Sequence, residues 1–344
     1  MSGESKITQK IESTQEAYYN CEVVYFHSGC MDGFAAAYIY NLFNKHKKLR
    51  FEPIAAGQET KYAEDVDLVF LDVAPHVAQL DNLMSNRYGN ILLIDHHQKT
   101  AETFIDALAN KYANKIGTKI TIVFSITRCA SVLTLEYLSA RPRTIKEINA
   151  PVVEGTYIYG AQLCTEFIED RDLWTWKLEN SKEVSAYLFH VLRLPNKHEY
   201  MAQAFEKFDI IIEAFAYSFG APQKYIDGGS LLLENNEKLY KQIAGTHKIC
   251  TLTTSSGKTY RVAHVQTRLF RSEVGNYLLE LHKDAIDCSV CWHYDVEADK
   301  FWLSFRSDDT HVDTNAICSE FGGGGHRNAA GCEIKGAFSQ YFTW

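Results

Sequence analysis

The chain has 344 residues, 46% of them hydrophobic and 23% charged, which is the composition of a soluble globular protein long enough for two domains. A formal net charge of −8 argues against avid, non-specific binding of long nucleic acid, but it allows a short oligonucleotide or nucleotide in a local basic cleft. The nine cysteines lack disulfide-like spacing, the first 20 residues are polar, and no stretch approaches the roughly 18 apolar residues of a membrane span. We therefore expect a cytoplasmic protein without a membrane segment, and the sequence leaves oligomerisation open.

The first part of the chain alternates apolar runs with helical patterns. Strands are predicted at 21–26, 51–54, 66–72, 90–94 and 118–124, and helices at 34–43, 76–88, 102–114 and 129–138. This alternation of strands and helices predicts a mostly parallel sheet with helices on both faces.

The remaining segments suggest a connector and a second domain. A looser segment is expected between Pro142 and Pro151, followed by helices at 153–167, 184–192 and about 201–247, with an interruption at Gly220-Ala221-Pro222. The tail has strand patterns at 260–266, 287–293 and 300–305 and helices at 272–282 and 313–320. We expect an α/β protein with a parallel-sheet catalytic domain at 1–195, a helical connector at 196–247 and a smaller α/β domain at 248–344.

Three predicted strands end in residues that bind metals or transfer protons. The first is followed by His27 and Cys30-Met31-Asp32-Gly33, the second ends in Asp72, and the third ends in Asp95-His96-His97. In an open α/β sheet, ligands bind beyond the carboxyl ends of the strands. With Asp170, these residues form a mixed carboxylate and imidazole set that suits Mn²⁺, Mg²⁺, Fe²⁺ or Zn²⁺. One carboxylate bridging two cations about 3.5–4 Å apart would activate a water and neutralise a phosphate.

The same residues, in this order and spacing, resemble the DHH/DHHA1 phosphoesterase superfamily. The resemblance rests on His27, Asp32-Gly33, Asp72, Asp95-His96-His97, Asp170 and the distant run Gly322–His326. That group includes RecJ-like exonucleases, nano-RNA and pAp phosphatases, cyclic-dinucleotide phosphodiesterases and pyrophosphatases. The resemblance implies two Mn²⁺ ions, one held by His27 and Asp72 and the other by Asp32, Asp72, His96 and Asp170. It also implies that Asp95 orients the histidines and that His97 faces the scissile phosphate as an electrophile or proton donor.

Two positions leave alternatives open. The family's first loop usually reads Asp-x-Asp, and here Cys30 takes the first place. Its thiolate could bind a metal, favouring zinc or iron over manganese, or the thiol could be a small buried group in a tight turn. The family pattern selects Asp170 as the last ligand, although Asp172 is an alternative that could also pair with Arg171. Trp174 and Trp176 are interpreted as core residues or as a base-stacking wall.

The glycine run near the C-terminus predicts a phosphate site. Glycines let the backbone approach a phosphate closely and direct N–H groups at it, and the match to the family's Gly-Gly-Gly-His signature favours this over a flexible loop. Substrate contacts are expected from Gly323, Gly324, Gly325, His326 and Arg327, with Arg306 as a second phosphate clamp. Cys288 and Cys291 would point to opposite faces of a strand and are interpreted as core, and His264, His282 and His293 as surface or core histidines.

These expectations combine into one functional hypothesis. The chain would hydrolyse a phosphoester or phosphodiester bond of a short oligonucleotide or small nucleotide, bound between the two domains, through a metal-activated water and without a covalent intermediate. One alternative is an exopolyphosphatase or pyrophosphatase that uses the same site. The other is a non-catalytic nucleotide-binding or scaffold protein, for which Cys30 is the hint in the sequence.

Overall fold

The computed structural model describes residues 21–45, 49–140, 155–218 and 220–344. The contacts divide the chain into two units, Met1–Leu232 and Leu233–Trp344. The division falls inside the segment predicted as a connector, and the segment expected to be looser between Pro142 and Pro151 lies outside the described residues. Among the helices of these ranges, none combines the length and apolar character needed to cross a membrane.

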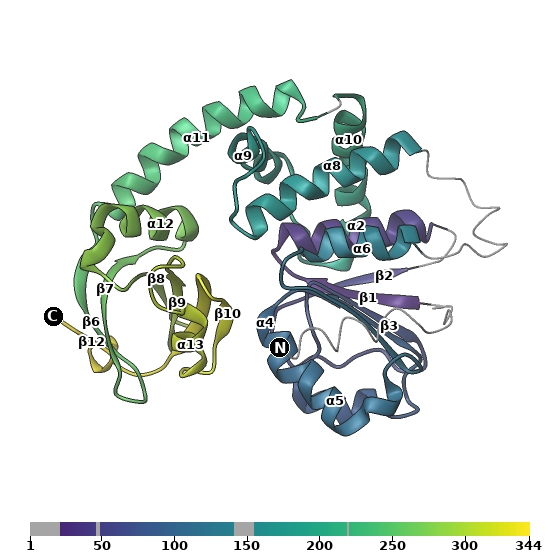
Figure 1. Ribbon diagram of the computed structural model, residues 1–344, viewed down its shortest axis with the longest axis horizontal. Coiled ribbons are helices and arrows are strands. Elements are labelled where there is room, and N and C mark those ends of the chain that lie inside the picture. Colours follow the sequence, from purple (N-terminus) through teal and green to yellow (C-terminus); the bar gives the residue numbers. More distant parts are fainter. Residues whose placement is uncertain (1–20, 46–48, 141–154, 219) are drawn as a thin grey trace. The chain divides into compact units, whose positions relative to one another are not determined.

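Unit 1 contains a five-stranded, entirely parallel sheet in the order β2-β1-β3-β4-β5 (Figure 1). Its strands are β1 (Cys21–His27), β2 (Arg50–Ile54), β3 (Asp67–Leu71), β4 (Ile91–Asp95) and β5 (Ile120–Phe124). This strand order is that of a doubly wound fold, whose winding direction reverses between β1 and β3. Because ligands bind at this reversal, beyond the carboxyl ends of the strands, the topology itself marks where a site is expected.

Alternate residues of the strands pack against different helix layers. Val24, Val69 and Leu92 contribute to a core with α2, α6, α8, α9 and α10, whereas Val23, Leu68 and Leu93 pack with the segments on the other face, including α5 (Figure 1). The helices of unit 1 are α2 (Met31–Phe43), α3 (Leu80–Leu83), α4 (Gln98–Thr100), α5 (Asp106–Tyr112), α6 (Ala130–Ala140), α8 (Gly155–Asp172), α9 (Ser181–Val191) and α10 (Met201–Ser218). The predicted parallel sheet with helices on both faces is confirmed.

Three predicted segments of unit 1 differ from the helices that the structure contains. Only a 3₁₀ turn at Val77–Gln79 and the short α3 form within the helix predicted at 76–88. The helix predicted at 102–114 starts earlier, with α4, and passes through a π-helical turn at Ala101–Ile105 before α5. Helix α10 lies in the segment predicted as a connector, yet its apolar residues, including Phe208 and Phe215, belong to the core of unit 1.

Unit 2 contains a seven-stranded mixed sheet in the order β10-β11-β9-β8-β7-β6-β12. Its strands are β6 (Lys248–Thr253), β7 (Thr259–Gln266), β8 (Cys288–Asp295), β9 (Lys300–Arg306), β10 (Gly324–His326), β11 (Ala329–Ile334) and β12 (Phe342–Thr343). Helix α12 (Arg271–His282) connects the parallel pair β7 and β8 and covers one face with the end of α11 (Gln223–Ala244). The short α13 (Thr314–Ser319) packs on the other face. The predicted second α/β domain is confirmed, but four of its strands, β6, β10, β11 and β12, were not predicted.

Candidate metal centre

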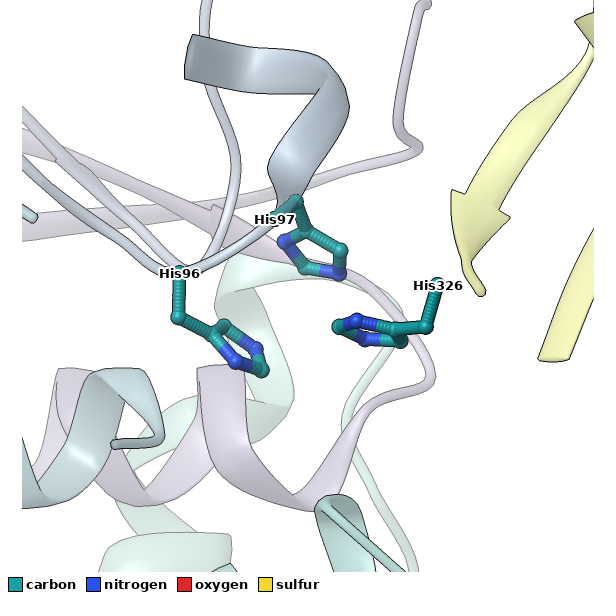
Figure 2. A group of neighbouring side chains, drawn as sticks. All are labelled: His96, His97 and His326. Atoms are coloured by element: carbon teal, nitrogen blue, oxygen red, sulfur yellow. The ribbon is translucent and has the colours of Figure 1, made fainter. Parts of the chain in front are cut away.

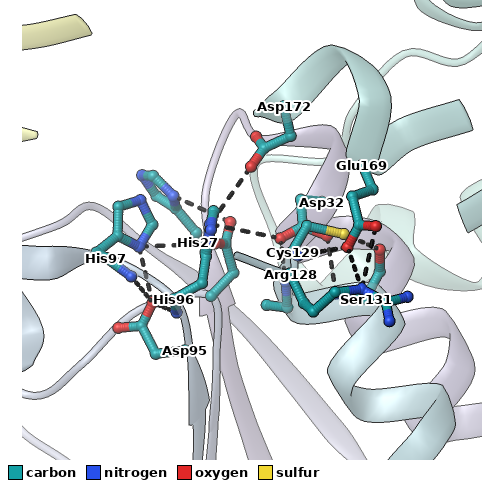
Figure 3. A network of polar contacts seen from close by, with 12 residues as sticks. His27, Asp32, Asp95, His96, His97, Arg128, Cys129, Ser131, Glu169 and Asp172 are labelled. Carbon is teal, nitrogen blue, oxygen red and sulfur yellow. Dashed lines mark hydrogen bonds and ion pairs between the residues drawn. The ribbon is translucent and has the colours of Figure 1, made fainter. Parts of the chain in front are cut away.

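The structure brings polar side chains together at the carboxyl ends of β1, β3 and β4. The residues of this cluster are His27, Asp32, Asp72, His96, His97 and Asp172, with Asp95 behind the histidines (Figure 3). Three adjacent parallel strands supply most of them because the carboxyl ends of such strands meet at one edge of a sheet. The cluster therefore lies where the doubly wound topology places ligands.

Asp72 lies at the centre of the cluster. It directly follows β3, and its Oδ2 accepts a hydrogen bond from His27 Nδ1 at 3.2 Å, while its Oδ1 lies 3.2 Å from His96 Nε2. The ligand atoms of His27, Asp72 and His97 lie within 4.8 Å of one another, and so do those of Asp32, Asp72 and His96. Asp72 is thus shared by two groups of metal-ligand type, as expected for a bridging carboxylate.

The backbone at Asp72 has an unusual conformation. Its φ is 60°, in the left-handed region, although the residue is not glycine and is only 1% exposed. Aspartate tolerates this region better than most residues, but the conformation still costs free energy and persists only where the surrounding structure holds it. The left-handed turn directs the carboxylate of Asp72 across the strand ends, toward the histidines of β1 and β4.

Asp32 enters the cluster from the first turn of α2. Its two carboxylate oxygens accept hydrogen bonds from the N–H groups of Ala130 at 2.7 Å and Ser131 at 2.8 Å, at the N-terminus of α6 (Figure 3). The positive end of a helix dipole favours a carboxylate at this place. The next residue is Gly33 because a Cβ there would lie 2.8 Å from the carbonyl oxygen of His27. The Asp-Gly pair thus lets α2 approach β1 closely enough to place Asp32 at the cluster.

Asp95 holds the histidine that follows the strand. Its Oδ1 accepts a hydrogen bond from His97 Nδ1 at 2.7 Å and from the N–H of His96 at 2.7 Å, and its Oδ2 accepts from Thr100 Oγ1 at 2.6 Å. The rings of His96 and His97 lie side by side after β4, with centres 4.6 Å apart (Figure 2). With Nδ1 of His97 bonded to Asp95, the opposite ring nitrogen, Nε2, points away from this acid. These contacts are those expected of a residue that orients the histidines.

Asp170 and Asp172, the two candidate acids at the end of α8, face different parts of the structure. The carboxylate of Asp170 accepts hydrogen bonds from the Thr175 hydroxyl and from the N–H groups of Lys177 at 2.8 Å and Leu178 at 3.0 Å, so it holds the turn after α8. Asp172 instead points to the cluster, with Oδ2 at 3.4 Å from His96 Nε2 (Figure 3). Residues two positions apart on a helix are separated by about 200° around its axis, so Asp170 and Asp172 point in different directions. Asp172, the alternative, is therefore the acid of this pair that faces the cluster, and its binding of a metal stays a prediction.

The charges of the cluster are mutually dependent. Burial, together with the charges of Asp72 and Asp172, raises the pKa of Asp32 to about 7. Burial also raises the pKa of Asp172, whereas for Asp72 the hydrogen bonds from His27 and His96 outweigh burial and lower the pKa well below its ordinary value. Burial disfavours protonated His96, yet Asp72 and Asp172 raise its pKa to about 10. Three buried carboxylates so close together require positive charge nearby.

The donor set fits divalent cations. Oδ1 of Asp72 and Oδ2 of Asp172 are both buried and both face Nε2 of His96, at 3.2 and 3.4 Å, so that one N–H group can satisfy at most one of them. Buried oxygens that lack a donor are costly unless a cation compensates them. Carboxylate oxygens with imidazole nitrogens are ligands that Mn²⁺, Mg²⁺, Fe²⁺ and Zn²⁺ accept.

Cys30 lies next to this cluster, at the residue before α2. Burial raises the pKa of its thiol well above the ordinary value, and the charges of Asp72, Asp172 and Asp32 raise it further. The sulfur is therefore close to the three acids but remains protonated without a cation. That Cys30 binds a metal stays a prediction.

The glycine run of unit 2 has a different structural role from the expected one. Gly324–His326 forms the edge strand β10, in register with β11. A Cβ at Gly323 would lie 2.2 Å from the carbonyl oxygen of Gly331, and one at Gly325 would lie 2.5 Å from that of Ala329. The N–H of Gly323 donates to the carbonyl of Cys318, and that of Gly325 donates to Asn315 Oδ1. These two N–H groups therefore already have acceptors within unit 2, and contact of the glycine run with a phosphate stays a prediction.

The charged residues predicted to contact substrate lie around this hairpin. His326 ends β10 (Figure 2) and is partly exposed. Nη2 of Arg327 donates to the carbonyl of His311 at 3.0 Å, and Nη2 of Arg306 donates to Ser272 Oγ at 2.7 Å. Both guanidinium groups thus have partners within unit 2. Their role in binding substrate, like the expected position of the substrate between the domains, stays a prediction.

Arg128 and Glu169 support the cluster but were missed in the sequence. Glu169 accepts hydrogen bonds from Arg128 Nε and from the N–H of Cys129 at 2.8 Å, which ties α8 to the start of α6 (Figure 3). This contact fixes the helix end that carries Asp172 against the helix end that holds Asp32. The two residues are 41 positions apart, and no local pattern connects them.

Comparisons with known proteins agree with this architecture. No protein-family model matches the sequence. An uncharacterised protein of Acanthamoeba polyphaga mimivirus is 24% identical over 332 residues, which cover 92% of this chain and 68% of that protein. Among solved structures, the DHH domain of a protein described as a member of a family of ribosomal proteins has a TM-score of 0.51 at 14% identity, covering 92% of this chain and 83% of that one.

A second solved structure is more distant. RecJ of Thermus thermophilus, in complex with Mn²⁺, has a TM-score of 0.46 at 12% identity and covers 91% of this chain and 50% of its own. The similarity to the DHH domain, together with the parallel sheet and the acids and histidines at its strand ends, agrees with the motifs in the sequence. The chain thus has the fold of that DHH domain.

Proposed function

We propose that this chain is a metal-dependent phosphohydrolase that cleaves phosphoester or phosphodiester bonds in short oligonucleotides or small nucleotides. The observation that carries the proposal is the buried Asp72 carboxylate, which is shared by two groups of ligand atoms. A shared carboxylate of this kind is the feature that two-metal hydrolases need.

The residues divide between two metal positions. His27 and Asp72 would hold one cation, with His97 and Cys30 beside it, and Asp32, Asp72, His96 and Asp172 would hold the other. The resemblance to the superfamily favours Mn²⁺ at both positions. When bound, such cations supply a deprotonated water at neutral pH and neutralise the charge of the phosphoryl group.

His97 and Asp95 act together in this proposal. Asp95 Oδ1 accepts a hydrogen bond from His97 Nδ1 at 2.7 Å, which keeps a proton on Nδ1 and fixes the ring orientation. Burial lowers the pKa of His97, but Asp95 and Asp72 raise it to about 9, so the ring also carries a proton on Nε2 at neutral pH and can donate it to the phosphoryl group or the leaving oxygen. From the resemblance, Arg306, His326 and Arg327 are proposed to contact the phosphates of the substrate.

A panel of metals and substrates tests the proposal. Metal-free protein would be assayed with Mn²⁺, Mg²⁺, Fe²⁺ and Zn²⁺ on a short RNA, pAp, a cyclic dinucleotide and polyphosphate. We expect hydrolysis of a nucleotide substrate with Mn²⁺. If product were released only from polyphosphate, the substrate would be a polyphosphate and not a nucleotide. Tight binding of a nucleotide without turnover in any metal would favour a scaffold protein.

Asp72→Asn provides the test of the site. We expect kcat/KM to fall by about 100-fold or more, because substituting a residue that only supports a metal ligand already lowers metal affinity or activity by about 10–100-fold. Asp81→Asn is the matched control, since Asp81 is exposed and pairs with Lys111 at 2.6 Å. Undiminished Mn²⁺-dependent turnover in Asp72→Asn would disprove the proposed centre.

A further inference from the structure

The turn that follows α8 presents two tryptophans next to the metal cluster. The carboxylate of Asp170 holds this turn by accepting from Thr175, Lys177 and Leu178, and its carbonyl accepts from the N–H of Thr175 at 2.9 Å. The chain thus wraps around one buried acid. Residues 173–178 have a defined conformation, and the side chains of Trp174 and Trp176 are positioned by it.

Both tryptophans have left-handed backbones. The φ of Trp174 is 54° and that of Trp176 is 51°. For a bulky side chain this region is a genuine outlier that costs free energy. Strained residues of this kind persist where the surrounding structure holds them, and they concentrate at ligand sites.

The aromatic side chains at this turn are partly exposed, and contacts with one another and with Arg171 hold them in place. Trp174 is 36% exposed and Phe189, on α9, is 40% exposed. The guanidinium of Arg171 lies 4.3 Å from the ring centre of Phe189 and 5.8 Å from that of Trp174. The ring of Trp176 lies edge-on to Trp174 at 4.8 Å. Trp174 is thus more exposed than a tryptophan of the core would be.

The patch of Trp174, Trp176, Phe189 and Arg171 lies close in the chain to an acid of the cluster. Asp172, whose Oδ2 lies 3.4 Å from His96, is two residues before Trp174. Consecutive Cα atoms are about 3.8 Å apart, so the Cα atoms of Asp172 and Trp174 lie within about 7.6 Å of each other. Trp174 therefore follows an acid of the cluster closely enough for one nucleotide to reach both, provided that its ring lies on the side of the cluster.

The local charge also suits a nucleotide. Arg171, Lys177 and Lys182 lie on or beside the patch, and Lys182 Nζ is 5.7 Å from the ring centre of Trp176. Cations around a stacking surface are typical of sites for single-stranded nucleic acid, where a base stacks on an aromatic ring and basic groups follow the backbone.

We infer that Trp174 stacks on the base of the nucleotide whose phosphate lies at the cluster, and that Trp174 selects base-bearing, single-stranded substrates over polyphosphate. This inference rests on the proposed function for the place of the phosphate. Stacking requires only a π face, so Trp174 confers little preference among the four bases.

Binding without turnover tests the inference independently of hydrolysis. The affinities of the Mn²⁺-loaded protein for AMP and for ribose 5-phosphate would be measured by calorimetry. In Trp174→Leu we expect AMP to bind about tenfold more weakly, which corresponds to about 1.4 kcal/mol, whereas ribose 5-phosphate changes less than about twofold. Trp174→Phe keeps a π face and should recover most of the affinity for AMP.

Trp302→Leu is the matched control. Trp302 is 39% exposed and has Lys300 Nζ 4.5 Å from its ring centre, but it lies on β9 in unit 2. This variant should bind both ligands as the unmodified protein does. The inference is overturned if the unmodified protein binds AMP no more tightly than ribose 5-phosphate, or if Trp174→Leu weakens both ligands equally or neither.

Kinetics separate this inference from the proposed function. With the dinucleotide pApA, Trp174→Leu should raise KM about tenfold and leave kcat nearly unchanged, and an abasic dinucleotide should show no such difference. If neither dinucleotide is hydrolysed in any metal, the proposed function fails, while the AMP measurement still decides the stacking. A variant that changes only self-association and not KM would mark the patch as a protein interface and overturn the inference.

Discussion

Two acids at the end of α8 should respond in opposite ways to the same substitution. In metal-free protein, Asp172→Asn removes a charge that burial and Asp72 disfavour, as the raised pKa of Asp172 indicates. We expect its stability to be unchanged or to rise by up to about 1 kcal/mol. Asp170→Asn removes a charged acceptor of three hydrogen bonds. Hydrogen bonds to charged groups contribute about 1.5–3 kcal/mol each, and Asn keeps one acceptor oxygen, so we expect a loss of about 2–4 kcal/mol.

Metal binding should reverse this order. A cation at about 100 times its Kd stabilises the folded protein by about 2.7 kcal/mol. If Asp172→Asn raises Kd about 100-fold, the same concentration stabilises by only about 0.4 kcal/mol. For a domain of this size, 1 kcal/mol corresponds to about 2–4 °C, so a thermal shift of about 5–11 °C should fall to about 1–2 °C. Asp170→Asn should start from a lower Tm and keep most of the shift.

Differential scanning fluorimetry with and without MnCl₂, with Kd measured by calorimetry, distinguishes the two variants. Asp81→Asn serves as the control for replacing an exposed acid by its amide. The reasoning is refuted if Asp170→Asn loses the Mn²⁺ shift while Asp172→Asn retains it, because the acid chosen from the sequence would then be the ligand.

Two further predictions concern unit 2. Gly323→Ala should lower the free energy of unfolding in urea by about 1–3 kcal/mol, because its Cβ would lie 2.2 Å from the Gly331 carbonyl oxygen. Gly331→Ala is the control and should be tolerated, since its Cβ would make an ordinary contact at 3.4 Å. Equal effects of the two substitutions would contradict this packing. Burial lowers the pKa of His264 to about 4, below the value of about 6.5 in the unfolded chain, so the unfolded state binds more protons between these values. Stability should therefore fall by up to about 3 kcal/mol as the pH drops from 6.5 to 4, and urea midpoints across this range should show a smaller slope in His264→Gln.

The sequence predicted the sheet of unit 1 because its strands are buried on both faces. Ile91–Ile94 and Leu68–Leu71 are continuous apolar runs of fully buried residues, and each ends at the acid or histidine that the sheet edge then presents. Strand ends of this kind are visible without knowledge of tertiary contacts. The strands β10 and β11 were missed because they contain glycine and alanine where strands usually have branched or aromatic residues.

The glycine run shows why one pattern supports two interpretations. Glycine permits close approach of the backbone to a phosphate, and equally to another strand. Only the position of β11, which meets Gly323 and Gly325, decides between them. Since that neighbour follows in the chain after the hairpin turn, the pattern Gly-Gly-Gly-Gly-His alone does not reveal which surface the glycines face.

At the end of α8, too, the sequence pattern does not show which way a side chain faces. A match of spacing cannot say which of two acids separated by about 200° faces the sheet, because that depends on how the helix is rotated against α6. The contact of Glu169 with Arg128 and Cys129 fixes this rotation. It turns Asp172 toward His96 and leaves Asp170 to hold the turn that carries Trp174. One helix end therefore supplies both an acid that faces the cluster and the support for the aromatic patch.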